Sequence, residues 1–130
     1  ARSGERSAGV PIVASDRDAG AVEAAIANAE RAGVAADVQV RRAALSAMEP
    51  IAGTGLVATN PPYGVRVQGA GDIRNLYAQL GNVLRERFAG WKVAFYSPEP
   101  RLTSQLGIPV SESFATSNGG IRVSANEGKV

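Results

Sequence analysis

Apolar runs of strand length alternate with helical patterns along most of this 130-residue chain. Residues 10–14 form the first run and are expected as a buried strand that leads into acidic residues. From Ala19 to Ala32, apolar residues recur at three- and four-residue steps, which marks one face of a helix. Asp18 is well placed to cap the start of this helix, and Gly33 is well placed to end it.

The rest of the chain continues the alternation. Further strands are expected at residues 38–40, 55–59, 91–96, 110–116 and 120–125, and helices at residues 72–88 and 98–106. Asn118-Gly119, between the last two strands, is a strong signal for a β-hairpin and is most simply a turn. The pattern predicts one α/β domain over residues 1–130, with a mostly parallel sheet, helices on its faces and an antiparallel pair at the end.

The residue types that the chain lacks restrict its chemistry. The sequence contains neither Cys nor His, which excludes a disulfide framework, a thiolate metal site and imidazole as a base or metal ligand. No apolar stretch approaches the roughly 18 residues needed to cross a bilayer. A reaction here must use carboxylates, amides, hydroxyls, Tyr or backbone groups, and neither a metal nor a membrane is expected.

The strongest candidate for chemistry is Asn60-Pro61-Pro62-Tyr63, which directly follows the apolar run at residues 55–59. The motif is therefore predicted at the carboxyl end of a strand, the edge where open α/β sheets bind ligands. Proline has no backbone donor, so the Asn60 side-chain oxygen and the Pro61 carbonyl could accept both N–H bonds of an exocyclic base amine. Tyr63 could stack on that base. These four residues are candidate catalytic residues; the simpler interpretation is an Asn-Pro turn.

Asp16 is the candidate for cofactor binding, because it ends the first apolar run just before a helix. A carboxylate in that position can accept both hydroxyls of a ribose. Its structural alternative is helix capping, for which Asp18 is better placed. Arg17 could lie along an adenine face or be solvated, with solvation slightly favoured. Asn60 is a further candidate cofactor contact, beside the methyl donor.

Some large side chains are expected to serve packing. Tyr77 and Leu80 fit the inner face of the helix at residues 72–88, and Trp91 opens the strand that follows. We therefore expect these three in the core and not at a site.

With these residues in place, the chain resembles the THUMP-associated ribosomal RNA guanine-N2 methyltransferases of the large subunit. The resemblance runs through Ser15 to Val34, Asn60 to Arg66, Leu76 to Leu84, Phe88 to Trp91 and Asn118 to Ile121. It implies a Rossmann-like class I methyltransferase fold, S-adenosylmethionine as cofactor, ribosomal RNA as partner and a cytoplasmic location. The Asn-Pro-Pro-Tyr element is shared with DNA adenine and protein glutamine methyltransferases. Adenine-N6 DNA methylation and a non-catalytic remnant that binds RNA or protein are therefore the alternatives.

The chain departs from that family's pattern at two points. Such domains begin with a strand and a glycine-rich turn that cradles the methionine part of the cofactor, and nothing of that kind precedes Val10. In the family's strand order, this strand lies between those ending at Asp16 and Thr59, so both would have unpaired edges. The missing N-terminal part of the domain, or another chain, is thus an expected partner. The family's acidic residue for the adenine amine corresponds here to Ala43.

Overall fold

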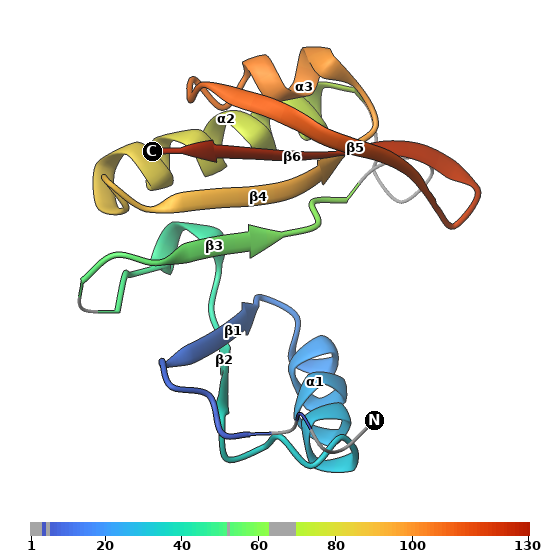
Figure 1. The fold of residues 1–130 in the computed structure, drawn as a ribbon. Helices are drawn as coiled ribbons and strands as arrows, with labels where there is room; N and C mark the ends of the chain where they lie inside the picture. Colours follow the sequence, from blue (N-terminus) through green and yellow to red (C-terminus); the bar gives the residue numbers. More distant parts are fainter. Residues whose placement is uncertain (1–3, 5, 52, 63–69) are drawn as a thin grey trace. The chain divides into compact units, whose positions relative to one another are not determined.

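The computed structural model describes residues 4, 6–51, 53–62 and 70–130. The chain divides into two compact units, Ala1–Met48 and Glu49–Val130 (Figure 1). The elements follow in the order β1 (Ile12–Asp16), α1 (Ala19–Arg31), β2 (Val38–Arg42), the 3-10 helix η2 (Leu45–Ala47), β3 (Leu56–Thr59), α2 (Ala70–Arg87), β4 (Lys92–Ser97), α3 (Pro100–Ser104), β5 (Val110–Asn118) and β6 (Ile121–Lys129).

The first unit is a parallel pair of strands with one helix against it. β1 and β2 pair from Ile12 opposite Val38 to Asp16 opposite Arg42, and α1 contacts both strands. The prediction of a buried strand at residues 10–14 was wrong in position and in burial. The strand begins two residues later, and Ile12 is 43% exposed. Most side chains of β1 are exposed because β2 is its only strand partner among the residues that the structure describes.

The two ends of α1 agree with the sequence prediction. The Asp18 side chain accepts the backbone N–H of Ala21 at 2.8 Å, as an N-cap does. Gly33 follows the helix with φ 73°, a left-handed conformation that glycine adopts without steric cost. The Val34 N–H reaches the carbonyl of Ala29 at 2.9 Å, which completes a Schellman ending.

The second unit is a four-stranded sheet in the order β3-β4-β6-β5. β3 runs parallel to β4, while β6 lies antiparallel between β4 and β5. The predicted hairpin is confirmed, with its turn at Gly119 and Gly120, one residue beyond the expected Asn118-Gly119. Both glycines have positive φ, 58° and 81°, as a two-residue hairpin turn requires. β6 extends to Lys129, past the predicted end at residue 125, because it also pairs with β4.

The core of the chain lies where α2 and α3 cover one face of this sheet (Figure 1). Tyr77 of α2 meets Phe95 of β4 edge to face, with ring centroids 6.2 Å apart. The Tyr77 hydroxyl donates to the Tyr96 carbonyl at 3.3 Å, so its polar end is satisfied. The buried apolar residues are Tyr77, Leu80, Val83, Leu84, Phe88, Val93, Phe95, Leu102, Leu106, Ile108 and Val123. The core roles predicted for Tyr77 and Leu80 are thereby confirmed.

Trp91 packs at the edge of the core, where Phe88 meets its ring edge to face with centroids 5.3 Å apart. Its indole N–H donates to the Gly53 carbonyl at 3.0 Å, which agrees with the predicted packing role. α3 is shorter than the helix expected at residues 98–106. Among the residues that the structure describes, none of the helices has the length and apolar content for crossing a membrane.

Candidate functional site

The carboxyl end of β3 presents Asn60 to solvent. β3 ends at Thr59, which pairs with Phe95 of β4, and the chain then enters Asn60-Pro61-Pro62. The Asn60 side chain is exposed, Pro61 is buried and Pro62 is exposed. In the described part of the chain, no hydrogen bond occupies the Asn60 amide. A buried proline thus anchors the turn, and the amide next to it has no partner among the described residues.

Tyr63, the predicted stacking residue, lies outside the described residues. Its role therefore stays a prediction, as does the joint action of the four motif residues. What the structure provides is the placement of Asn60 and Pro61 at a sheet edge, with rigid backbone between them.

Asp16 is the last residue of β1. It therefore lies at the carboxyl end of its strand, as Asn60 does after β3. One carboxylate oxygen, Oδ1, accepts the backbone N–H of Asp18 at 2.8 Å. The Asp16 carbonyl accepts the N–H of Ala43 at 2.9 Å. The other carboxylate oxygen forms no hydrogen bond within the described residues, and the side chain is exposed. The Asp18 bond holds the carboxylate in one orientation with Oδ2 available to a hydroxyl.

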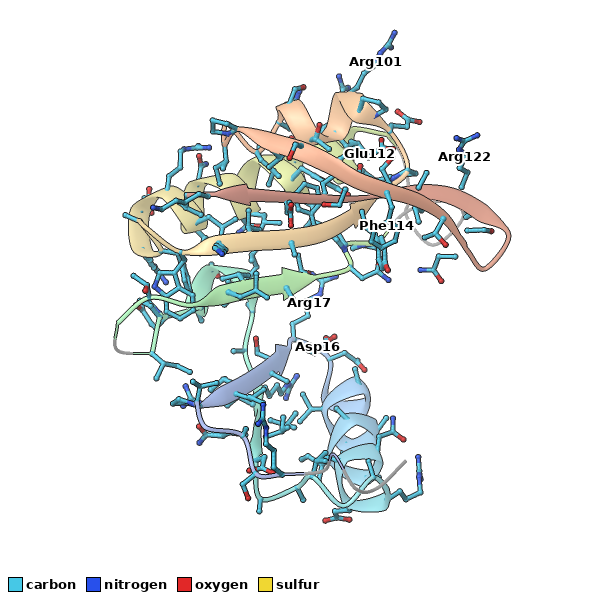
Figure 2. All side chains as sticks on the ribbon, viewed as in Figure 1. Asp16, Arg17, Arg101, Glu112, Phe114 and Arg122 are labelled. Carbon is cyan, nitrogen blue, oxygen red and sulfur yellow. The ribbon has the colours of Figure 1, made fainter. Side chains whose placement is uncertain are left out.

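Arg17 and Ala43 complete the description of this strand end. The Arg17 side chain is exposed, and its carbonyl accepts the Arg42 Nε–H at 3.1 Å. Ala43 offers only a methyl group, so it provides no carboxylate for an adenine amine. Figure 2 shows the Asp16 and Arg17 side chains at the end of β1. The candidate residues are therefore divided between the units, with Asp16 and Arg17 in the first and Asn60 to Pro62 in the second.

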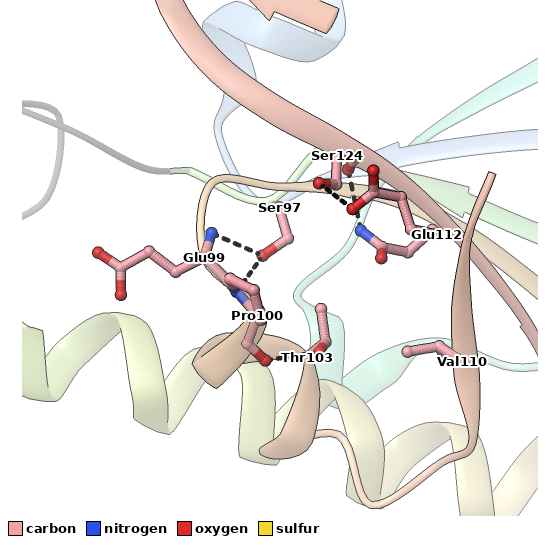
Figure 3. Close-up of a pocket in the computed structure, with 8 residues that line it drawn as sticks. Ser97, Glu99, Pro100, Thr103, Val110, Glu112 and Ser124 are labelled. Carbon is pink, nitrogen blue, oxygen red and sulfur yellow. Dashed lines mark hydrogen bonds between the residues drawn. The ribbon is translucent and has the colours of Figure 1, made fainter. Parts of the chain in front are cut away.

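A polar pocket that the sequence did not reveal lies at the end of β4 (Figure 3). Its volume is about 200 Å³, and it is lined by Ser97, Glu99, Pro100, Thr103, Val110, Glu112, Ser124 and Asn126. Ser97 and Asn126 are buried, whereas Glu99 and Glu112 are exposed at the rim. The available sequence signal was the pair of polar residues Ser124 and Asn126, two positions apart in β6 and half-buried and buried respectively, where apolar residues are expected. Among the described residues, no group of three or more Asp and Glu could hold a metal ion.

Residues 1–126 match the family described as RMKL-like, methyltransferase domain. The ribosomal RNA large subunit methyltransferase K/L of Syntrophotalea carbinolica is 38% identical over 114 residues, which cover 85% of this chain and 16% of that protein. A putative RNA methyltransferase of Synechocystis is 33% identical over 122 residues, which cover 93% of this chain and 32% of that protein. The chain thus spans less than a third of the length of these relatives.

Solved structures show the same fold. The putative methyltransferase SMU.472, complexed with SAH, superposes with a TM-score of 0.82 at 22% identity, over 91% of this chain and 31% of that one. TrmN from Thermus thermophilus gives a TM-score of 0.69 at 19% identity, over 92% of this chain and 36% of that one. The α/β, Rossmann-like fold class predicted from the sequence is confirmed.

Proposed function

Because this chain belongs to the RMKL-like methyltransferase-domain family, as its sequence resemblance predicted, we propose that the protein carrying it methylates a guanine in ribosomal RNA. The acceptor is the exocyclic amino group of that base. The observation that carries the proposal is the exposed Asn60 at the carboxyl end of β3, next to buried Pro61. Support for the RNA comes from relatives named ribosomal RNA large subunit methyltransferase K/L.

Asn60 and Pro61 act by orienting the base. An exocyclic amine is a weak nucleophile, because its lone pair is delocalised into the ring. When the Asn60 Oδ1 and the Pro61 carbonyl each accept one N–H bond, the nitrogen becomes more tetrahedral and its lone pair turns towards the donor. Tyr63 stacks on the extruded base and Pro62 keeps the turn rigid. The rate enhancement comes from holding the reactants in line, without a covalent intermediate.

Asp16 is proposed to hold the cofactor ribose. Its Oδ2 is free within the described residues and its Oδ1 is held by the Asp18 N–H, so the carboxylate is preset to accept a hydroxyl. The Asp16 carboxylate fits the ribose of a nucleoside cofactor, and Arg17 of the same unit is proposed to lie along the adenine face. S-adenosylmethionine, when bound, supplies an electrophilic methyl group on its sulfonium. Ala43 contributes no carboxylate to this site.

Both units are proposed to belong to one methyltransferase domain, because the family match at residues 1–126 spans both. β1 and β3 each have one strand partner among the described residues. Their other edges leave backbone N–H and carbonyl groups available for pairing. A further strand, from the protein's own preceding residues or from another chain, is the proposed partner. The curated relatives contain two thirds or more of their length outside the match.

The test is Asn60→Ala in the complete protein, with transfer of labelled methyl groups to ribosomal RNA as the readout. We expect a loss of about a hundredfold or more, since both the orientation and the hydrogen bond disappear. Asn28→Ala, on the exposed surface of α1, is the matched control and should be near the parent. Activity of Asn60→Ala within about threefold of the parent, roughly 0.7 kcal/mol, would contradict the assignment and favour a non-catalytic remnant. Faster methylation of DNA adenine than of ribosomal RNA would overturn the proposed substrate.

A further inference from the structure

The pocket at the end of β4 presents hydrogen-bond acceptors to whatever enters it. Its hydroxyl donors are engaged with the protein: Ser97 Oγ donates to the Glu99 carbonyl at 3.0 Å, Thr103 Oγ1 to the Pro100 carbonyl at 2.7 Å, and Ser124 Oγ to Glu112 Oε2 at 2.7 Å. Figure 3 shows the Ser97 and Ser124 bonds as dashed lines. The pocket is therefore suited to a ligand that donates hydrogen bonds.

Two acceptors in the pocket are left without protein partners in the described part of the chain. Asn126 uses its Nδ2 to donate to the Ser124 carbonyl at 2.9 Å, which leaves its Oδ1 open. Glu112 uses Oε2 for Ser124 and has Oε1 open. Asn126 is only 7% exposed, so its side chain is held in place by the surrounding protein. Among the described residues, no buried side-chain N or O atom lacks a hydrogen-bond partner, so an open oxygen here is one that the pocket leaves accessible to a ligand.

The pocket lies near the proposed methylation site within the same unit. Thr59, the last residue of β3, pairs with Phe95 in parallel register, so the Asn60-Pro61 turn and Ser97 of β4 lie at the same end of two neighbouring strands. Neighbouring strands lie about 4.8 Å apart. Ser97, which lines the pocket, is therefore on the strand next to β3, at the end where the chain leaves β3 for the Asn60-Pro61 turn.

Two exposed arginines flank the pocket. Arg122, Ser124 and Asn126 alternate along β6, so they point to the same face of the sheet. Arg101 projects from α3, which contributes Pro100 and Thr103 to the pocket wall. Figure 2 shows both guanidinium groups extended away from the protein. Arginine can bond two phosphate oxygens at once, so a nucleic-acid backbone could pass over the pocket.

We propose that this pocket is a subsite for an unpaired RNA base beside the methylated nucleotide, which Glu112 and Asn126 recognise by its exocyclic amine. Carboxylate and amide oxygens accept from base amines, and proteins read single-stranded RNA on such exposed base edges. Arg101 and Arg122 contact the flanking phosphates. The inference rests on the proposed function in taking RNA as the substrate and the Asn60-Pro61 turn as the place of methylation.

The test measures RNA binding by the complete protein without cofactor, by fluorescence anisotropy. The probes are two single-stranded RNAs of about 12 nucleotides, one of adenosine and one of purine riboside, which differ only in the exocyclic amine. We expect the adenosine RNA to bind on the order of tenfold more tightly. Glu112→Gln should abolish most of this preference and leave binding of the purine riboside RNA unchanged, because glutamine can still accept from Ser124.

The control is Glu127→Gln, at an exposed position of β6 on the opposite face, which should keep the preference. Asn126→Leu is a second variant and should lose it. Equal binding of the two RNAs by the parent protein, or a preference kept by Glu112→Gln, would overturn the subsite. Asn60→Ala should keep the preference. The binding test can therefore fail or succeed independently of methyl transfer.

Discussion

The two units bury their side chains to different extents. In the second unit, Tyr77, Leu84 and Val93 are 0% exposed. In the first unit, none of the described residues is buried, and Ile12 and Val13 of β1 are 43% and 36% exposed. Parallel sheets normally have both faces covered by helices. A two-stranded pair with one helix cannot provide that cover, so the first unit depends on further structure for its stability.

Hydrogen exchange should show the largest difference between the units. We expect hydrogen-bonded amides of β1 and β2 to exchange at least about a hundredfold faster than those of β4 and β6, a gap of ~2.7 kcal/mol in opening free energy. Mass spectrometry of peptides from each unit measures it. Exchange from β1 should slow in the complete protein, if a further strand pairs with it. Equal protection in this chain alone would contradict the comparison.

Truncation of one apolar side chain in each unit tests the same difference. Leu84→Ala removes a fully buried side chain and should lower the free energy of unfolding of the second unit by about 3 kcal/mol. Ile26→Ala removes a side chain that is 42% exposed and should cost about 1 kcal/mol. Urea denaturation gives both values, with Trp91 fluorescence reporting on the second unit. Similar costs for the two variants would mean that the first unit is better packed than its exposure indicates.

Gly81→Ala tests how tightly the second unit is packed. A Cβ at Gly81 would lie 2.0 Å from the Leu106 carbonyl oxygen, and backbone cannot move aside as a flexible side chain can. Alanine normally stabilises a helix interior relative to glycine by about 0.5–1 kcal/mol. Here we expect the opposite sign, a loss of about 2 kcal/mol, in the same urea denaturation. Gly9→Ala, whose Cβ meets nothing within 4 Å, is the control and should be close to neutral.

The smallest expected effect concerns the cap of α1. Asp18→Ala removes the hydrogen bond to the Ala21 N–H and should cost about 1 kcal/mol of the first unit's stability. Asp18→Asn keeps a capping oxygen and should cost much less. Thermal unfolding followed by far-ultraviolet circular dichroism compares the variants. Equal losses in both would show that the carboxylate charge, and not the cap, stabilises the helix.

Elements with local signals were predicted closely from the sequence. α2 runs from Ala70 to Arg87 against a prediction of residues 72–88, because its apolar periodicity is contained in the helix itself. The cap at Asp18 and the stop at Gly33 were found for the same reason. β1 was misplaced by two residues, since an apolar run indicates a strand without marking which residues pair with a neighbour.

The candidate site was predictable only in part. Asn60 and Pro61 were found because the motif is contiguous and follows a strand. The pocket was missed because Ser97, Glu112 and Asn126 come from three different strands, and only the pairing of β6 with both β4 and β5 brings them together. A β-bulge in β5 next to Glu112 is a further detail that alternation of residue types does not reveal.

By itself, the sequence determined the kinds of elements, their order, the hairpin and the strand-end motif, and with them the methyltransferase family. Each of these depends on residues a few positions apart, whose caps, turns and periodicity act locally. The tertiary structure alone decided that β6 inserts between β4 and β5, that no described residue of the first unit is buried, and that acceptor groups converge in a pocket at the end of β4. These features depend on strand register and burial between distant residues, which no local pattern specifies.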